Sequence, residues 1–570
     1  MSHHRLLLTS LLMLAMCATE HAQEPSPVPR DPDRPATGTI EGKVVNEMGQ
    51  PLAGAILFLR GRAASVIVRN ATSDLEGNFR VSGLEPALYT ISATAPAYTS
   101  AIPDPDAPVY YRIGDSARVE LIRGGAITGT VTNSLGEPLI SVRVRATMIR
   151  TAHGEPPKSP FVFGEKLTDD RGIYRIYGLA PGTYLVSAGG SGISSMFNPY
   201  EGDAATFAPS ATRDNASEVV VRTGEDTNVD IRYRGEPGHT ISGTVKSVGG
   251  TGATIMLTTV GGDLHLATAF QMPGARGFAF GGISDGDYEL SSQEMNLPQS
   301  SSTPSFNVSE TKRVTVRGAD VTGVELVTQP PGTISGRIVH ENSKVPECKG
   351  KRSPLHAETL IEFKQPDSQE KEESIYHKLF INPTVPDATG AFTLRNLRPG
   401  RYQLQPRFYA RYWYLQSIIS SATSGKPQKI DAAARWTTVK AGEQVSNLTI
   451  TLAEGAASLR GQTPLAEGAV VPAGKVVFLI PQEADKTEDV LRFFVTSIAA
   501  DGTFAFDHLP PGKYLMLAEA DPDPQVATQA RLRQPEAASA RAKMRRSAEA
   551  VKTELDLKPC QNLTKYQLMQ

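Results

Sequence analysis

Residues 172–184 read Gly-Ile-Tyr-Arg-Ile-Tyr-Gly-Leu-Ala-Pro-Gly-Thr-Tyr, and this stretch decides the fold. Pro181-Gly182 combines a preset φ at one turn position with tolerance of positive φ at the next. After it, Tyr184-Leu185-Val186 alternates apolar and other positions with period two, which places alternate side chains on one buried face. The stretch therefore predicts a strand, a tight turn and a second strand.

The same block occurs five times. Its first aromatic residue always lies ten positions before a closing tyrosine, and an aliphatic residue lies five before it. The closing tyrosines are Tyr89, Tyr184, Tyr288, Tyr402 and Tyr514. The third copy departs most, with Asp285-Gly286 at the turn. Fixed offsets of this kind indicate repeated domains. We expect each tyrosine ring to be buried with its hydroxyl reaching backbone at the corner, as in the tyrosine corner of β-sandwiches.

A second element precedes each block and has a glycine at its centre. These glycines are Gly42, Gly129, Gly243, Gly336 and Gly461, so each unit holds about a hundred residues. Short strands with turn signals at this density predict a β-sandwich of about seven strands per unit. Short extended segments such as Val119-Glu120-Leu121-Ile122 join the units, which predicts a semi-rigid row extending on the order of 150 Å.

These motifs resemble the carboxypeptidase regulatory-like domain. The resemblance rests on Gly49-Gln50-Pro51-Leu52-Ala53-Gly54-Ala55, with Asp-x-x-Gly-x-Phe and Leu-x-Pro-Gly-x-Tyr downstream, and it covers nearly all of residues 37–520. It implies a transthyretin-like sandwich, grouped with starch-binding-like folds, on exported or outer-membrane bacterial proteins, with no fixed catalytic residues. The fold expected is all-β: a tandem array of about five transthyretin/Ig-like seven-stranded β-sandwiches with a short C-terminal helix.

The expected organisation begins with a signal peptide and a disordered spacer and continues through five sandwiches. The boundaries are 1–22 signal peptide, 23–36 spacer, 37–123, 124–234, 235–330, 331–454 and 455–521 sandwiches, and 522–570 C-terminal helix and terminal strand. The helix is expected at Ala537–Leu555, which is rich in helix formers and lacks Gly and Pro.

The first residues are typical of a secretory signal. His3, His4 and Arg5 precede an apolar run, Leu6–Ala18, which is too short to span a bilayer comfortably. Leu14-Ala15-Met16-Cys17 resembles a lipoprotein box, with Met16 where a small residue is normally required, so lipidation at Cys17 stays open. No other apolar run reaches the length of a membrane span. We expect an exported protein that is periplasmic, outer-membrane-associated or extracellular, without a transmembrane segment in the mature chain.

Charge, histidines and cysteines bear on chemistry. Lys+Arg 58 against Asp+Glu 60 gives a net charge of −2, which excludes a general basic footprint for nucleic acid. The mature chain has no His-x-x-Glu pair, and its histidines lack ligand spacing. We therefore predict no enzyme, catalytic residue, metal or cofactor.

Cys348 and Cys560 remain after removal of the signal, and an exported chain can pair them in a disulfide. Whether they approach closely enough stays open.

One aromatic segment, residues 408–414, offers a candidate ligand site. The chain has two tryptophans, and both lie in or near it. Exposed aromatic faces can stack on sugar rings, and the candidates are Tyr409, Tyr412, Trp413, Tyr414 and Trp436. The other interpretation is that alternate aromatics pack between the fourth and fifth units.

The predicted function is a non-catalytic, exported cell-envelope scaffold of β-sandwiches that contacts other proteins. The alternative is a carbohydrate-binding protein that uses the aromatic residues on the same fold, and a distant third is the regulatory part of a peptidase system. The partners expected are envelope proteins or glycans, neither of which the sequence identifies.

Overall fold

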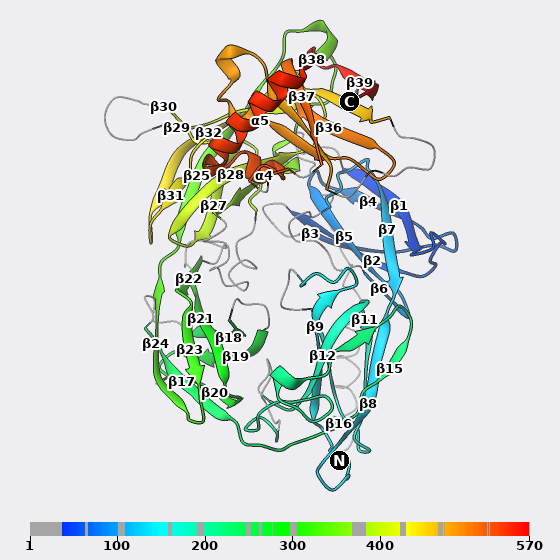
Figure 1. Cartoon of the computed structure of the whole chain (residues 1–570), viewed down its shortest axis with the longest axis vertical. Helices are drawn as coiled ribbons and strands as arrows, with labels where there is room; N and C mark the ends of the chain where they lie inside the picture. Colours follow the sequence, from blue (N-terminus) through cyan, green and yellow to red (C-terminus); the bar gives the residue numbers. More distant parts are fainter. Residues whose placement is uncertain are drawn as a thin grey trace, which may run out of the picture.

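The computed structural model describes residues 37–568 except 63–66, 101–108, 158–161, 191–198, 247–251, 261–264, 276, 297–304, 367–382, 422–428, 465–470, 472–473, 521 and 524. The expected signal peptide, spacer and lipidation at Cys17 lie outside the described residues. Strands dominate the remainder, as the repeats predict, and the chain is all-β with one longer helix near its C-terminal end (Figure 1).

The strands fall into five units in chain order. The first has β1 (Gly38–Asn46), β2 (Ile56–Arg62), β3 (Ile67–Thr72), β4 (Asn78–Leu84), β5 (Leu88–Thr94), β6 (Tyr98–Ser100) and β7 (Ser116–Arg123). The second has β8 (Gly125–Thr132), β9 (Arg143–Thr151), β10 (Phe163–Leu167), β11 (Ile173–Leu179), β12 (Gly182–Ala188), β13 (Thr206–Phe207), η1 (Arg213–Asn215), β14 (Val219–Val221), β15 (Asp226–Asn228) and β16 (Ile231–Arg232). The third has β17 (His239–Lys246), β18 (Ala253–Thr259), β19 (His265–Gln271), β20 (Phe278–Ile283), β21 (Gly286–Asn296), β22 (Ser305–Ser309), β23 (Lys312–Val316) and β24 (Val321–Gln329).

The last two units carry most of the short helices. The fourth has β25 (Gly332–Glu341), η2 (Pro346–Cys348), η3 (His356–Glu358), β26 (Thr359–Lys364), β27 (Ala391–Leu397), β28 (Gly400–Phe408), β29 (Trp413–Ser421), β30 (Lys429–Asp431), β31 (Thr437–Val439) and β32 (Gln444–Glu454). The fifth has β33 (Ala457–Gln462), β34 (Val476–Pro481), η4 (Ala484–Lys486), η5 (Val490–Arg492), β35 (Phe494–Ser497), β36 (Thr503–Leu509), β37 (Gly512–Glu519), α4 (Gln529–Leu532), η6 (Pro535–Ala537), α5 (Ala538–Val551), β38 (Thr553–Leu557) and β39 (Asn562–Gln567).

The pairing of the first strand recurs in all five units. The first strand of each unit pairs antiparallel with the first strand of the repeated block and parallel with one or two late strands of the unit, as β1 does with β4 and β7. The central glycine allows this parallel strand to approach, because a Cβ at Gly42 would collide with the backbone of Ala117 and one at Gly336 with that of Leu448. This close approach gives the recurring glycine a physical reason.

The tyrosine corners form as predicted. Each closing tyrosine is buried, and its hydroxyl donates to the carbonyl oxygen four residues earlier. The five bonds are Tyr89 to Glu85, 2.7 Å; Tyr184 to Ala180, 2.7 Å; Tyr288 to Ser284, 2.7 Å; Tyr402 to Arg398, 2.7 Å; and Tyr514 to Pro510, 2.8 Å. The bond satisfies a carbonyl at the strand-to-strand turn while the aromatic body fills the core. Burial raises the pKa of the hydroxyls of Tyr89, Tyr184, Tyr288 and Tyr514.

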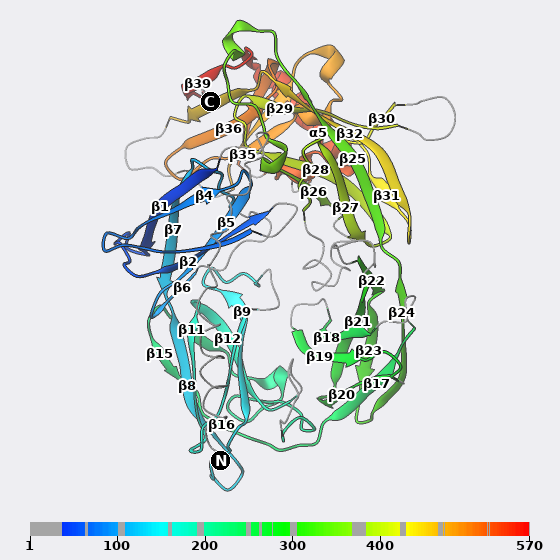
Figure 2. The ribbon, with the colours of Figure 1, turned by 180° about the vertical axis from the view of Figure 1, so that it is seen from behind.

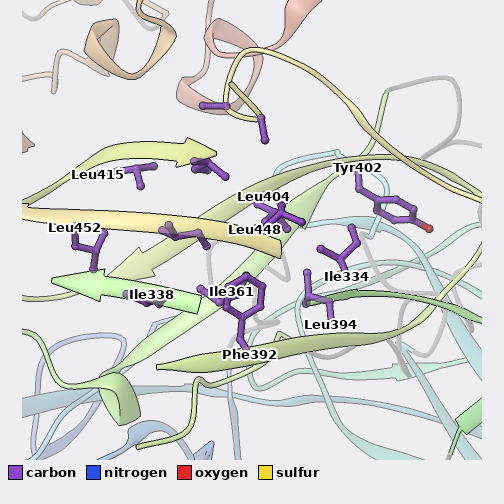
Figure 3. Close-up of a cluster of buried hydrophobic side chains, with 14 of the residues drawn as sticks. Ile334, Ile338, Ile361, Phe392, Leu394, Tyr402, Leu404, Leu415, Leu448 and Leu452 are labelled. Carbon is purple, nitrogen blue, oxygen red and sulfur yellow. The ribbon is translucent and has the colours of Figure 1, made fainter. Parts of the chain in front are cut away.

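Each unit encloses a core between its two layers of strands. In the fourth unit, β27-β25-β32-β29-β30 packs against β26-β28-β31. Ile334, Leu394 and Leu448 of the first layer meet Ile361 and Tyr402 of the second (Figure 3). The third unit differs, because β22 pairs with both β21 and β24 and joins its strands into one continuous sheet. Its departure from the repeat sequence is therefore matched by a departure in topology.

The C-terminal segment belongs structurally to the fifth unit. β38 pairs with β37 in one layer, and β39 pairs parallel with β33 in the other. The helix α5 precedes both strands and packs Ala540, Met544 and Ala548 against the outer face of the layer that contains β37. The short C-terminal helix is confirmed, and the two strands after it complete a sandwich that the sequence boundaries end at residue 521.

The units do not form the extended row that the short links predict. They follow one another around a ring of units, in which the first unit returns to contact the fourth (Figure 1, Figure 2). The links are short as expected, with β7 and β8 separated by Gly124 alone. The prediction of a row was wrong because links set the distance between units and leave the direction of each turn to the contacts between their loops.

Candidate interaction site between the first, fourth and fifth units

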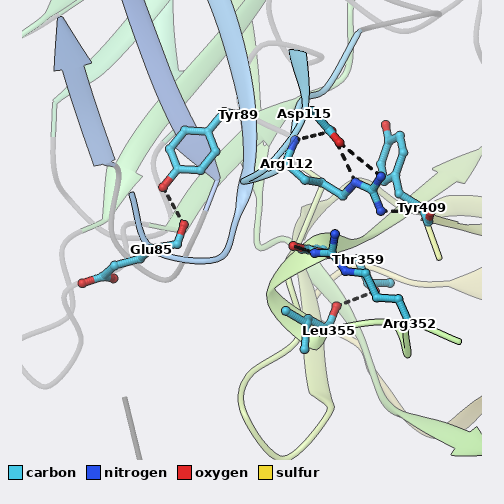
Figure 4. Close-up of polar contacts among 9 residues, drawn as sticks. Glu85, Tyr89, Arg112, Asp115, Arg352, Leu355, Thr359 and Tyr409 are labelled. Atoms are coloured by element: carbon cyan, nitrogen blue, oxygen red, sulfur yellow. Dashed lines mark hydrogen bonds and ion pairs between the residues drawn. The ribbon is translucent and has the colours of Figure 1, made fainter. Parts of the chain in front are cut away.

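The contact that closes the ring of units is centred on Arg112. Its Nη1 donates to the carbonyl oxygen of Tyr409 at 3.0 Å, and its guanidinium carbon lies 5.6 Å from the centroid of the Tyr409 ring (Figure 4). Asp115, on the same unit, accepts from Nε and Nη2 at 3.4 and 3.3 Å. The carboxylate orients the guanidinium, which then makes a cation–π contact and a hydrogen bond to the same tyrosine.

Apolar side chains seal this contact. Leu88 and Tyr110 of the first unit and Leu360 of the fourth form one buried cluster, with Tyr409 packed against it. Burial raises the pKa of Tyr110, and the nearby Arg62 works in the opposite direction. Side chains fully removed from water at a contact between units supply most of its stabilisation.

A strap of residues 342–358 links this contact to the fifth unit. It leaves β25, carries η2 and η3, and ends at the buried Glu358, whose carboxylate pairs with Arg352 at 2.6 Å. Burial raises the pKa of Glu358, and the charges of Arg352 and Arg112 oppose this. Cys348 in the strap is bonded to Cys560, with the two Cα atoms 5.4 Å apart. The strap therefore connects the first, fourth and fifth units.

The aromatic candidates for sugar stacking lie beside this region, and Trp413 is fully buried. Its carbonyl oxygen lies 2.8 Å from Nδ1 of His508 of the fifth unit, and its ring meets His340 edge-on at 5.5 Å. Because neither face of Trp413 reaches solvent, the prediction that it stacks on a sugar is not sustained. Its burial beside His508 agrees with the interpretation that places it between the fourth and fifth units.

The other aromatics each have a charged or buried environment. Tyr409 lies against Arg112, and the Lys351 ammonium lies 4.6 Å from the centroid of Tyr412. Burial raises the pKa of Tyr414. The indole N–H of Trp436 donates to both oxygens of Glu536 at 2.9 and 3.1 Å. A sugar-stacking role for Tyr409, Tyr412, Tyr414 and Trp436 stays a prediction.

Sequence reasoning missed the residues that close the ring of units, Leu88, Tyr110, Arg112, Glu358 and Leu360. They lie in different units, so no local pattern connects them. The one local signal is Val109-Tyr110-Tyr111, an apolar and aromatic run beside a segment rich in Asp and Pro. Such a run outside the repeated blocks is what a contact between units requires.

Among the described residues, no group of three or more His, Cys, Asp or Glu side chains lies close enough together to hold a metal ion. In the same part of the chain, no helix combines the length and the apolar character that crossing a bilayer requires.

Comparison with known proteins identifies a domain family for part of the first unit. Residues 39–113 match the family model of the carboxypeptidase regulatory-like domain. The resemblance expected for the first unit is confirmed. No curated protein matches the chain.

Solved structures that match are similar only in part. The Bacillus anthracis TIE protein shares 14% identity over 51% of this chain and 50% of its own, with a TM-score of 0.14. The minor pilin GBS52 of Streptococcus agalactiae shares 13% over 35% of this chain and 96% of its own, TM-score 0.19. The major pilin subunit BcpA of Bacillus cereus shares 12% over 51% of this chain and 99% of its own, TM-score 0.14. The chain thus matches half the length of the first of these proteins.

Proposed function

We propose that this protein is an exported, non-catalytic scaffold of the cell envelope that presents a ring of β-sandwiches to other envelope proteins. The observation that carries the proposal is the Arg112 contact, because it fixes the relative positions of units that are far apart in sequence. A set of rigidly placed surfaces is what a scaffold needs, since preorganisation lowers the entropic cost of binding. The bonded pair Cys348 and Cys560 supports export, since disulfides persist in oxidising compartments.

The test opens the ring of units without unfolding its parts. Arg112→Ala combined with Tyr110→Ala removes both the polar and the aromatic anchor of the first unit. We expect the radius of gyration in small-angle X-ray scattering to rise, while far-UV circular dichroism stays unchanged. Arg171→Ala is the matched control, because Arg171 is exposed and pairs with Asp169 two residues away.

Photo-cross-linking in cells then tests the scaffold role. A photo-cross-linking residue at Leu75 or Leu135, both strongly exposed, should link the same envelope proteins in the parent and in the Arg171→Ala control. The opened variant should lose those that bridge two units. An unchanged set of partners in the opened variant contradicts the proposal, and so does accumulation of the chain in the cytoplasm when residues 1–22 are present.

A further inference from the structure

A cleft lies between the first and second units, away from the Arg112 contact. Its volume is about 910 Å³. The side chains that matter on its two walls are Ile56, Thr94 and Tyr98 from the first unit and Arg175, Tyr177 and Asp226 from the second. β6 and β11 lie side by side here, where the two units meet (Figure 1, Figure 2). Ligand sites occur preferentially at such boundaries between domains.

The walls of the cleft are held at a fixed separation. β7 runs into β8 through Gly124 alone, and a Cβ at Gly124 would stand 2.9 Å from the Cα of Gly178. The backbones of the two units are therefore in contact at one end of the cleft. Because this contact and the short link restrict hinge motion, the cleft is present before any ligand arrives, which lowers the cost of binding.

One wall exposes an aromatic ring. The side chain of Tyr177 is 65% exposed, in contrast to the five buried corner tyrosines. The Lys166 ammonium lies 5.2 Å from its centroid. On the other wall, Ile56 is 46% exposed and begins an apolar row along β2 that continues with Phe58, 41% exposed. Exposed apolar faces in a continuous arrangement mark sites of interaction.

Polar groups surround these faces and carry both signs of charge. Arg175 and Asp226 form an ion pair in which Nη2 of the arginine lies 2.9 Å from each carboxylate oxygen, and both side chains are about half exposed. The hydroxyl of Thr94 lies on the opposite wall, and on the sheet face the register places Ser92 beside Phe58. Arg123 also lines the cleft, so two guanidinium groups face one carboxylate, and the Arg175–Asp226 pair leaves one positive charge, fewer than a polyanion site requires. Planar polar groups and hydroxyls beside an aromatic face suit a ligand that has C–H faces and many hydroxyls.

We propose that this cleft binds a neutral oligosaccharide, with Tyr177 stacking on a sugar ring and Arg175 and Asp226 hydrogen-bonding to its hydroxyls. The exposed row on β2 extends the surface to further sugar units. This site shares no residue with the aromatic segment 408–414. It is independent of the scaffold proposal, because it requires only the first two units to be in place.

The test is affinity electrophoresis of the full mature chain in gels that contain soluble neutral polysaccharides: a mixed-linkage β-glucan, xylan, galactomannan and glycogen. We expect at least one of them to retard the parent chain. Tyr177→Ala should weaken the apparent affinity at least about tenfold, the scale of one aromatic contact. Asp226→Ala should weaken it as well, because it removes the acceptor for sugar hydroxyls.

Phe270→Ala is the matched control, since Phe270 is 60% exposed on β19 of the third unit. It should leave retardation unchanged. Thermal melting of each variant should match the parent, because the substituted side chains are exposed. Retardation by none of the four polysaccharides overturns the proposal, as does equal retardation of the parent and Tyr177→Ala. If Tyr177→Ala instead removes photo-cross-links to envelope proteins and no polysaccharide is bound, the cleft is a protein-docking surface and the proposal is wrong.

Discussion

Two junctions between units are built on the same kind of link: the one between the first and second units and the one between the fourth and fifth. In both, the last strand of one unit runs into the first strand of the next, through Gly124 in one case and through Gly455-Ala456 in the other. The fourth–fifth junction is closed by the buried Trp413, by a disulfide and by the turn before α5, where the carbonyl oxygen of Arg533 accepts from Gln403 and the carboxylate of Glu536 accepts from Trp436. The first–second junction keeps an open cleft beside its link.

The difference shows that the repeated sandwich does not determine how units pack on one another. The corner tyrosines and the strand order recur at both places. The segments added to the fourth and fifth units fill their junction, namely the strap and the C-terminal region. The first and second units add little at theirs. Packed and open junctions therefore arise from one fold by insertion.

The largest expected effect contrasts a tryptophan at the packed junction with a tyrosine at the open one. Trp413→Ala should lower the free energy of unfolding by about 3–5 kcal/mol, because it leaves a large cavity in a core that cannot fully collapse. Tyr177→Ala should change it by less than about 0.5 kcal/mol, because the side chain is exposed. Differential scanning calorimetry resolves the transitions of a multi-domain chain. Similar shifts for the two variants would contradict the contrast.

Next in size is the disulfide. Replacing Cys348 and Cys560 together by Ser should destabilise the transition of the fourth and fifth units by about 2–4 kcal/mol, because the bond closes a long loop across two units. The parent chain, reduced while unfolded and then refolded in the presence of the reductant, should show the same shift in calorimetry. The transition of the first and second units should stay in place. A uniform shift of all transitions would show that the ring of units melts as one body.

Acid should weaken the packed junction between the fourth and fifth units. Burial lowers the pKa of His340 to about 4 and also lowers the pKa values of His356 and His508. As the pH falls from the ordinary histidine pKa of about 6.5 towards 4, the unfolded chain binds protons before the folded one, so stability falls in this window. The midpoint of the fourth–fifth transition, followed from pH 7 to 4.5, measures this. His340→Phe keeps an aromatic ring there and should flatten the dependence; an unchanged slope would contradict the assignment.

The smallest expected effect tests what the two regions share. Tyr184→Phe and Tyr402→Phe each delete a corner hydroxyl and leave a carbonyl without its partner, at a cost of about 1 kcal/mol. The cost should be equal in the second and fourth units, because the two bonds have the same length and burial. Urea denaturation of the two variants checks this. Unequal costs would mean that the junctions also alter the cores.

The sequence predicted the fold well because its signals are local. Two adjacent residues signal the strand-to-strand turn, and they are Pro-Gly in three of the five copies; the corner hydroxyl reaches a carbonyl four residues away, and a glycine recurs at the centre of the first strand of each unit. The site was predicted poorly because its residues come from separate units: Arg112 meets Tyr409 across 297 positions. The aromatic segment was noticed, but sequence alone does not separate a buried tryptophan from one that faces a ligand.

The amino-acid sequence by itself determined the repeated unit, its pair of strands around a turn and its buried corners, since these depend on contacts between residues that are close in the chain. Only the tertiary structure decided that the units close into a ring, that Trp413 lies in a packed junction and that Tyr177 faces an open cleft. The physical reason is that short links restrict distance, whereas direction follows from side chains that meet after each unit has folded. The contact between Leu88 and Leu360 leaves no pattern in the local sequence, because it joins two units and is not needed for the fold of either unit.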